Sequence, residues 1–546
     1  MYDPAPIGIL NMPFFGPELS PYEKFLRTGN LSHLYEMAGF DWLVVGIYLG
    51  ILGILSFYGL HRYIMAYLFH KHRGNLARPK ARFEDLPRVT VQIPSYNEMY
   101  VIERVIGGAC ALDYPRDRLE IQVLDDSTDE TRRIAAAAVS RWRERGMDIR
   151  YIHRSERTGY KAGALENGLR TARGEFIAVF DADFVPRPDF LHQVIHHFTD
   201  PDVGMVQARW EHLNRSYSLL TRAQAIFLDG HFMMESFVRF ASGRFFNFNG
   251  TAGVLRRATI EDAGGWEHDT LTEDLDLSYR AQLKGWKFVF LPDVTAPAEL
   301  PVEFNAFKAQ QCRWAKGAMQ TCKKVLPQVL RSSLSRGQKL EAFYHLTGNI
   351  SYPLMLLLSL ALFPALIVRY NQGWFELVLI DLPLFILAFS SVSTFYITSQ
   401  RALHKDWKKR IIYLPVLMSI GIGMCVAGAK AVLEGACGVR TPFVRTPKFS
   451  VQGNKGEWKS KKYRGRTGFV PWIELGLGFY YSYMVIYSVQ MGVYGILPFL
   501  MLFQFGFFYA GVFSLAQRMK WGWTSRLLYR IPPLRSADSN SAPMSL

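Results

Sequence analysis

The stretch Leu271–Trp314 reads LTEDLDLSYRAQLKGWKFVFLPDVTAPAELPVEFNAFKAQQCRW. An acidic cluster, TEDLD at 272–276, opens it, and QQCRW at 310–314 closes it. The run 283–291 between them is typical of a turn that leads into a buried strand. A carboxylate can take a proton from a sugar hydroxyl, an arginine can hold a phosphate with two hydrogen bonds, and an indole can stack on a sugar ring. Together these groups indicate transfer of a sugar from a sugar nucleotide.

Upstream of this stretch, residues 88 to about 300 have the pattern of a soluble α/β domain. Short apolar runs predict strands at 89–94, 121–124, 149–152 and 176–180, with helices at 101–110 and 130–145. Strands that alternate with helices predict a parallel, Rossmann-like sheet. Ligands of such sheets bind at the carboxyl ends of the strands.

Polar residues follow the first two of these strands. Tyr96 and Glu98 come after the first, and Asp125 and Asp126 come after the second. A carboxylate there can accept hydrogen bonds from a base or a ribose hydroxyl, and Tyr96 can stack on the base. Residues 127–129 are also ordinary helix N-capping residues, and the two interpretations are compatible.

Asp181 and Asp183 form a D-x-D motif directly after the strand 176–180. Mg²⁺ and Mn²⁺ prefer such oxygen ligands and are usually held by one or two carboxylates together with substrate phosphates. The predicted cofactor is therefore Mg²⁺ or Mn²⁺, which would neutralise a diphosphate leaving group. The alternative is a pair of aspartates that merely cap the strand.

These motifs resemble a known family. The spacing of Thr-Glu-Asp and Gln-x-x-Arg-Trp is similar to that of the processive β-glycosyltransferases of family 2, which include cellulose, hyaluronan and mannan synthases. FNGTAGV at 248–254 and the run 299–314 are most similar to the plant cellulose-synthase-like A and C proteins and their bacterial relatives. The resemblance covers roughly residues 85–450. It implies an α/β GT-A catalytic domain inserted among transmembrane helices.

The resemblance also implies roles for single residues. Asp274 is the expected general base of an inverting transfer, although Glu273 and Asp276 are local alternatives and an acidic first helical turn is a simpler explanation. Trp314 is expected to stack the acceptor sugar. The residues expected to bind the donor are Tyr96, Glu98, Asp125, Asp126, Lys161, Asp181, Gln310 and Arg313, with Asp181 and Asp183 as metal ligands.

A basic loop contains FVRTPK at 443–448. It resembles the gating loop that closes over the nucleotide in cellulose synthases, with Phe443, Thr446 and Lys448 at the expected spacing. Arg445 departs from the pattern of that loop. A plain basic segment that binds anionic lipid is the alternative interpretation.

Composition indicates a membrane protein. Of the 546 residues, 49% are hydrophobic and 14% are aromatic, which is high for a soluble enzyme. The net charge of +16 comes from basic residues beside apolar runs, so it favours the positive-inside pattern over binding of nucleic acid. The five cysteines lack C-x-x-C spacing and predict neither a zinc site nor a disulfide framework.

Apolar runs and their basic flanks predict the membrane topology. The loops 399–410 and 434–467 are both basic, so we expect the run 411–433 between them to be interfacial or re-entrant; six full spans are the alternative. The predicted parts are a non-cytoplasmic segment 1–41, a span 42–69, a cytosolic catalytic domain 85–303, interfacial helices 304–345, two spans within 346–398, the interfacial or re-entrant helix 411–433, a cytosolic gating-like loop 434–469, two spans within 470–514, and a cytosolic tail 515–546.

The sequence thus predicts a membrane-embedded inverting transferase in a bacterial inner membrane or the Golgi. It would polymerise sugar from GDP-mannose or UDP-glucose into a β-linked, β-1,4 glycan and move the glycan across the bilayer, with an accessory outer protein as one conceivable partner. A lipid glycosyltransferase that adds one sugar is the main alternative, and a non-enzymatic membrane protein is the other. Glu474 is expected to line the glycan channel, while Glu376 and Asp381 would mark the outer end of a helix.

Overall fold

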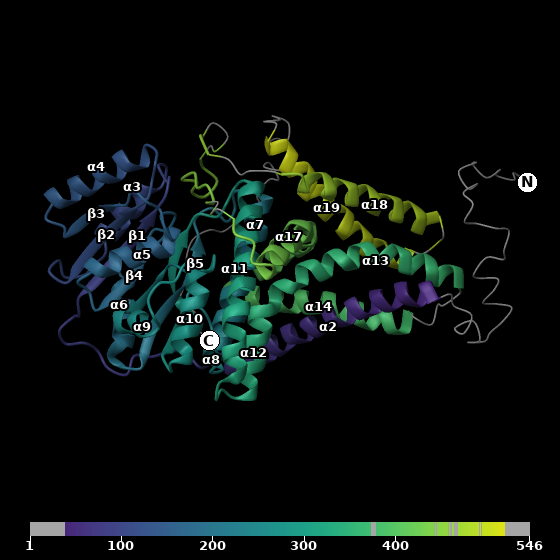
Figure 1. The fold of residues 1–546 in the computed structure, drawn as a ribbon, viewed down its shortest axis with the longest axis horizontal. Helices are drawn as coiled ribbons and strands as arrows, with labels where there is room; N and C mark the ends of the chain where they lie inside the picture. Colours follow the sequence, from purple (N-terminus) through teal and green to yellow (C-terminus); the bar gives the residue numbers. More distant parts are fainter. Residues whose placement is uncertain are drawn as a thin grey trace, which may run out of the picture.

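The computed structural model describes residues 39–372 and 378–518, except 442, 444, 457, 459–460, 464–467, 491 and 493. Figure 1 shows an α/β domain at one end of the molecule and a bundle of long helices at the other. The segment before Gly39, the tail after Arg518 and Glu376 lie outside the described residues.

The α/β domain is built on one sheet of seven strands in the order β3-β2-β1-β4-β6-β5-β7. The strands are β1 (Val89–Ser95), β2 (Leu119–Asp125), β3 (Ile149–His153), β4 (Phe176–Val179), β5 (Val203–His212), β6 (Gly253–Arg256) and β7 (Lys287–Ala298). The first four strands pair in parallel, and β5 pairs in parallel with β7. This mixed sheet has the GT-A architecture that the sequence predicts.

The four predicted strands are parallel, but the sheet also contains β6, which the sequence does not predict. This strand lies antiparallel between β4 and β5. Helical segments follow β5 and return the chain to the edge of the sheet at which β5 ends. β6 starts at that edge, so it runs in the direction opposite to β5. These helices are α7 (Leu219–Gly230), the π-helix η3 (His231–Ser236) and α8 (Phe237–Ala241).

Helices cover both faces of the sheet, which explains why its central strands are almost continuously apolar. One buried cluster joins the sheet to α3 (Ile102–Cys110), α4 (Thr131–Glu144) and α6 (Phe190–Val194), which η2 (Ile195–Thr199) follows. A second cluster joins the other face to α5 (Tyr160–Thr171), α9 (Arg257–Asp262) and α10 (Glu273–Leu283). The two buried faces hold the carboxyl ends of β1, β2 and β4 in fixed positions.

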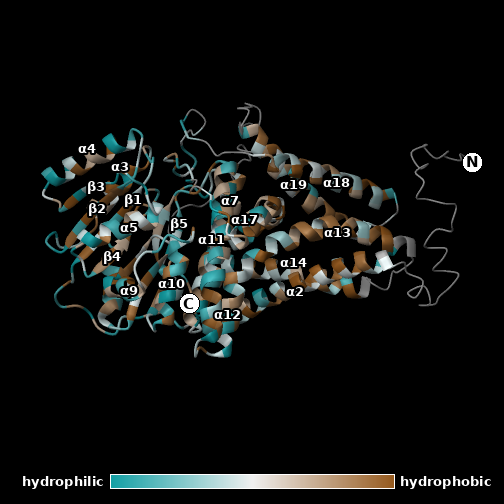
Figure 2. Cartoon of the chain, viewed as in Figure 1, coloured by the Kyte–Doolittle hydropathy of each residue, from teal (hydrophilic) through white to brown (hydrophobic). Residues whose placement is uncertain are grey.

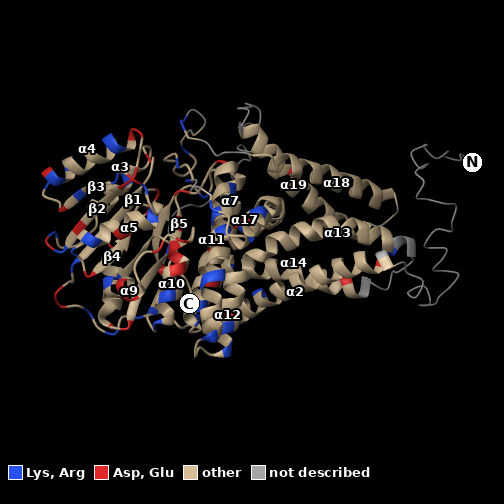
Figure 3. Cartoon of the chain, in the orientation of Figure 1, with Lys and Arg blue, Asp and Glu red and all other residues tan. Residues whose placement is uncertain are grey.

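Most of the rest of the described chain, apart from the loop between Ala436 and Val470, is helical. The helices are α2 (Gly39–His72), α11 (Phe304–Arg331), α12 (Arg336–Thr347), η4 (Gly348–Ile350), α13 (Ser351–Gln372), α14 (Val378–Leu403), α15 (Trp407–Arg410), η6 (Ile411–Tyr413), α16 (Leu414–Gly423), α17 (Cys425–Ala436), α18 (Val470–Gln490), η7 (Tyr494–Ile496) and α19 (Leu497–Arg518). Figure 2 shows that the helices of the bundle are largely hydrophobic, and Figure 3 shows that charge gathers on the α/β domain and near α11 and α12.

Within the described residues, four helical segments are long and apolar enough to cross a membrane: Asp41–His72, Arg336–Arg369, Ile380–Leu403 and Tyr494–Gln517. The pair α16–α17 is bent by 48° and is either a broken span or a re-entrant loop, which matches the two alternatives for residues 411–433. The predicted span 470–490 forms α18 but is not among the four, because tyrosines and Glu474 lower its hydropathy.

Candidate active site

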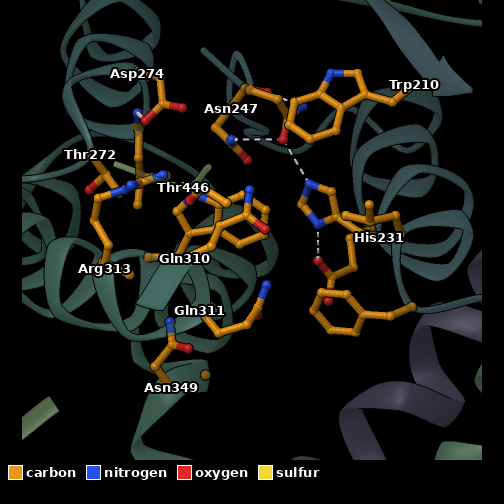
Figure 4. Close-up of a pocket in the computed structure, with 18 of the residues that line it drawn as sticks. Trp210, His231, Asn247, Thr272, Asp274, Gln310, Gln311, Arg313, Asn349 and Thr446 are labelled. Atoms are coloured by element: carbon orange, nitrogen blue, oxygen red, sulfur yellow. Dashed lines mark hydrogen bonds and ion pairs between the residues drawn. The ribbon is translucent and has the colours of Figure 1, made fainter. Parts of the chain in front are cut away.

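A single cavity of about 690 Å³ joins the sheet to the helix bundle. Its inner end is lined by the polar residues that follow β1 and β4, and its other end by side chains of α2, α13, α14 and α16. Figure 4 shows Asp274 and Arg313 on one side of this cavity and Trp210 and His231 on the other. Of the predicted site residues, those that line it are Tyr96, Glu98, Asp126, Lys161, Asp181, Asp183, Asp274, Gln310, Arg313, Trp314, Phe443, Thr446 and Lys448.

Two lysines neutralise the D-x-D motif. Lys161 Nζ lies 2.6 Å from Asp181 Oδ1, and Lys448 Nζ lies 2.6 Å from Asp183 Oδ2. Lys161 also donates a hydrogen bond of 2.8 Å to the carbonyl oxygen of Gly250. Burial lowers the pKa of Lys161, but Asp181 and Glu273 outweigh burial and leave it raised, so the ammonium is kept. The two carboxylates are therefore held in a cationic setting that also suits phosphate oxygens.

Asp274 lies in the first turn of α10, beside a second carboxylate. Its Oδ1 accepts a hydrogen bond of 2.8 Å from the backbone N–H of Leu275. Burial, and then the charge of Glu273, raise the pKa of Asp274 to about 7. A carboxylate with this pKa can exchange a proton near neutral pH, which is what a general base requires.

Helix α11 brings the downstream motif to the same cavity. Gln310, Arg313 and Trp314 lie on it and line the cavity. Burial lowers the pKa of Arg313, while neighbouring carboxylates, Glu273 first among them, oppose this change. Lys324 fixes α11 to α10, because its Nζ lies 2.9 Å from Asp269 and 3.0 Å from Asp276. The base and the guanidinium therefore sit on helices that are tied together.

Charged and aromatic side chains contact one another at the inner end of the cavity. The guanidinium of Arg157 lies 3.4 Å from the centre of the Tyr96 ring. Glu98 forms an ion pair of 3.0 Å with Arg445, and its pKa is raised to about 8 because burial outweighs that cation. Arg154 grips Asp126 with two hydrogen bonds, one of 2.8 Å and one of 2.5 Å.

Asp125 is the predicted site residue that the structure places outside the cavity lining. Its carboxylate is fully buried and accepts hydrogen bonds from the Ser127 hydroxyl at 2.5 Å and the Tyr151 hydroxyl at 2.7 Å. Those bonds fix the end of β2. The predicted contact of Asp125 with a nucleotide is untested.

The gating-like loop lies over the inner end of the cavity. Phe443 stacks on Tyr160 at 5.6 Å and lies 4.6 Å from the guanidinium of Arg313. Thr446 is buried, and its hydroxyl has no hydrogen-bond partner among the described residues. Glu299 accepts a hydrogen bond of 2.8 Å from the backbone N–H of Phe449 and thereby holds the loop against the end of β7.

The expectation for Glu474 is wrong. It is fully buried and outside the cavity lining, and both its oxygens lie 2.7 Å from Lys308 Nζ. The pair joins α11 to α18. A carboxylate in an apolar helix needs a partner, and an amine on a neighbouring helix supplies it here.

Sequence reasoning also misses residues on the opposite wall. Trp210, His231 and Asn247 line the cavity, and nothing in their local sequence distinguishes them from ordinary core residues. Only Asn249, inside the FNGTAGV motif, carries a signal. The π-helical turn that starts at His231 is a further sign, since such turns are frequent at functional sites, but it is visible only in the structure.

Comparison with known proteins gives one family, two similar relatives and one similar solved structure. Residues 87–317 match the family described as "Glycosyltransferase like family 2". The chain is similar to glucomannan 4-beta-mannosyltransferase 2 of Arabidopsis thaliana, with 46% identity over 257 residues, which are 46% of this chain and 48% of that protein. It is also similar to glucomannan 4-beta-mannosyltransferase 1 of Oryza sativa subsp. japonica, with 44% identity over 259 residues, which are 46% of this chain and 50% of that protein.

The chain spans about half the length of the curated relatives it matches. Among solved structures, the fold is similar to the mannosyltransferase PcManGT from Pyrobaculum calidifontis in complex with GDP-Man and Mn²⁺. That similarity covers 71% of this chain and 99% of the other, with 23% sequence identity and a TM-score of 0.47.

Proposed function

Because residues 87–317 are a domain of glycosyltransferase family 2, we propose that the protein is an inverting synthase that extends a β-linked glycan from a nucleotide sugar. The donor that fits the names of the relatives is GDP-mannose, and the corresponding linkage is β-1,4. UDP-glucose is the second donor to test. The catalytic domain faces the cytosol in this proposal, and the glycan leaves across the membrane.

One observation carries the proposal: the cavity that contains Asp181 and Asp274 continues between membrane-type helices. Its far end is lined by Leu52 of α2, Leu358 of α13 and Phe389 of α14. An enzyme that only modified a soluble acceptor would need no such extension. A growing chain that stays bound after each transfer does.

The inner end of the cavity would bind the donor. Tyr96, which has Arg157 stacked on one face of its ring, would contact the base, and Arg313, Lys161 and Lys448 supply positive charge for the diphosphate. Asp181 and Asp183 fit a divalent metal, because both offer oxygen ligands beside the expected phosphates. Mg²⁺ or Mn²⁺ held there would neutralise the leaving diphosphate.

Asp274 would then start the transfer. It takes the proton of the acceptor hydroxyl while that oxygen forms a bond to the anomeric carbon of the donor sugar. The bond from this carbon to the diphosphate breaks at the opposite face, so the configuration inverts and the diphosphate leaves with the electron pair. Trp314, beside Arg313 on α11, would stack the acceptor ring.

The far end of the cavity favours a second candidate, transfer of one sugar to a lipid. Among the described residues, its lining on α14 is Phe385, Ala388, Phe389, Val392, Phe395 and Tyr396, which offer few hydrogen bonds to a glycan. A hydrocarbon chain could occupy this end while its hydroxyl group reached Asp274.

Product analysis decides between the two. The purified full-length protein, in nanodiscs, is offered GDP-mannose, UDP-glucose or UDP-N-acetylglucosamine with Mg²⁺ or Mn²⁺, and release of nucleoside diphosphate is followed. A glycan of high molecular weight, cleaved by a linkage-specific glycanase, is the expected product. A single-sugar glycolipid would establish the second candidate, and no turnover with any donor would contradict both.

A further inference from the structure

The wall of the cavity opposite Arg313 contains a chain of hydrogen-bonded side chains. His231 Nδ1 lies 2.7 Å from Glu235 Oε2, and His231 Nε2 lies 2.7 Å from Asn249 Oδ1. Asn247 Nδ2 also donates to Asn249 Oδ1, at 3.3 Å. Figure 4 shows the His231 ring with a dashed line from each nitrogen. Both ring nitrogens therefore face oxygen atoms.

This chain fixes the direction of the Asn249 carboxamide. Its oxygen is already used by His231 and Asn247, so its NH₂ group is the end left for a ligand; its only bond among the described residues is a long one of 3.4 Å to the carbonyl oxygen of Asn247. An asparagine without these neighbours could turn its oxygen toward the cavity instead.

Two further polar atoms on this wall are buried without a hydrogen-bond partner in the described part of the chain. They are the indole N–H of Trp210 and the side-chain oxygen of Asn247. Buried polar groups are nearly always paired, so these two atoms are left for a water molecule or a polar ligand. One donor and one acceptor beside the NH₂ group of Asn249 match a ring that carries several hydroxyls.

The wall lies next to the predicted base. Gly250 follows Asn249, and a Cβ atom on Gly250 would come within 2.8 Å of Asp274 Oδ2. The positive φ of 77° at Gly250 also favours glycine at this position. A sugar bound by Asn249 would therefore have a hydroxyl within reach of Asp274.

The other end of the chain is anchored to a membrane-type helix. Arg239 Nη1 lies 3.9 Å from Glu235, and Arg239 Nε donates to Glu341 Oε1 at 2.9 Å. Glu341 Oε2 lies 3.0 Å from His61 Nε2 on α2. Arg239 and Glu341 are both almost fully buried. The contact of Arg239 with Glu235 is the longest in this network, and the charge of Arg239 attracts the Glu235 carboxylate without a hydrogen bond.

We propose that His231, clamped by Glu235, is a positioning residue for the acceptor sugar. It holds Asn249 so that the carboxamide NH₂, the Asn247 oxygen and the Trp210 indole N–H bind hydroxyl groups of the acceptor hexose beside Asp274. This inference rests on the proposed glycosyl transfer. It adds an acceptor-binding wall opposite the Gln-x-x-Arg-Trp helix.

The test compares two fates of the donor sugar in the full-length protein in nanodiscs. Sugar transferred to glycan is measured against sugar released free by hydrolysis, for the donor that the wild-type protein uses. His231→Gln is expected to lower incorporation into glycan at least tenfold while donor hydrolysis and donor KM change less than twofold. His192→Gln, on the exposed surface of α6, is the matched control and should leave both rates unchanged.

Asn249→Ser is the second variant, since it removes the positioned carboxamide without changing the π-helix. Combining it with His231→Gln should add no further loss, because the histidine acts through the asparagine. Equal loss of incorporation and hydrolysis, or an unchanged partition in Asn249→Ser, would overturn the inference. Absence of any donor turnover by the wild-type protein would instead contradict the proposed function.

Discussion

The two ends of the cavity differ in nearly every lining side chain. The inner end is lined by ionisable groups, which include Glu98, Lys161, Asp181, Asp274 and Arg313, and most of them are paired with an opposite charge. The far end is lined mostly by aliphatic and aromatic groups of α2, α13, α14 and α16, although His61 and Arg62 of α2 also line the cavity. If the proposed transfer takes place here, this difference predicts that bond formation is confined to the inner end. The other end can contribute only by holding or passing the product.

The largest effect is expected at the inner end. Asp274→Asn keeps the shape of the side chain but removes its ability to accept a proton, so kcat should fall by about 10³-fold or more. Burial makes the ionised carboxylate unfavourable, so the same change should raise the thermal stability. Diphosphate release and thermal denaturation measure the two effects. Activity within tenfold of wild type would exclude Asp274 as the base, and Glu273→Gln would be examined next.

A second change at the inner end separates charge from shape. Lys448→Met removes the ammonium that pairs with Asp183, so kcat/KM should fall by about 10²-fold, the loss expected when one cation near a leaving group is removed. The metal concentration for half-maximal activity should fall as well, because Lys448 no longer competes for Asp183. Lys455→Met, on an exposed lysine of the same loop, is the control. A normal kcat/KM in Lys448→Met would contradict a role for this loop at the diphosphate.

A bulky residue at the far end tests the other half of the comparison. Val392→Trp on α14 would narrow the cavity between the membrane-type helices. The expected result is a glycan several-fold shorter, with initial diphosphate release changed less than threefold. Ile386→Trp, on an exposed face of the same helix, should give products of normal length. Normal product length in Val392→Trp would mean that the product does not pass this way.

The inner end should also govern the pH profile. The Asp274 carboxyl must be ionised to accept a proton, and its pKa is raised to about 7, so kcat/KM should fall up to tenfold per pH unit below pH 7. The unfolded chain loses this proton near pH 3.8, so the folded protein binds it more tightly. The contribution of this proton to stability is therefore present at low pH and is lost as the pH rises through 7. A flat profile between pH 5 and 8 would contradict the assignment.

How much of this could be predicted depends on where the information lies in the chain. The roles of Asp274 and Trp314 could be predicted because each residue belongs to a short motif of fixed spacing that resembles a known family. Strands that alternate with helices predict the Rossmann-like sheet, and the resemblance adds the GT-A fold. The direction of β6 could not be predicted from the sequence, since it depends on where the preceding helices place the start of this strand. The position of His231 in the site could not be predicted either, because its partner Asn249 is distant in sequence and the π-helix has no local sequence signature.

The ion pair between α11 and α18 should have the smallest effect on chemistry. Glu474 does not line the cavity, so Glu474→Gln should leave kcat within twofold of wild type. It does leave Lys308 buried without its charge partner, so stability in detergent should fall. Apparent melting temperature and diphosphate release, measured on the same preparation, separate these effects. A large loss of kcat without loss of stability would indicate that Glu474 lines the path of the product after all.

Transfer of the product through the far end is the central claim, and a protection experiment tests it most directly. The protein is reconstituted in liposomes, and only the fraction with the catalytic domain outside receives donor and metal. Glycan made there should accumulate in the lumen and resist added glycanase until detergent opens the liposomes. Glycan that is cleaved at once in intact liposomes would show that the cavity builds the product without passing it across the membrane.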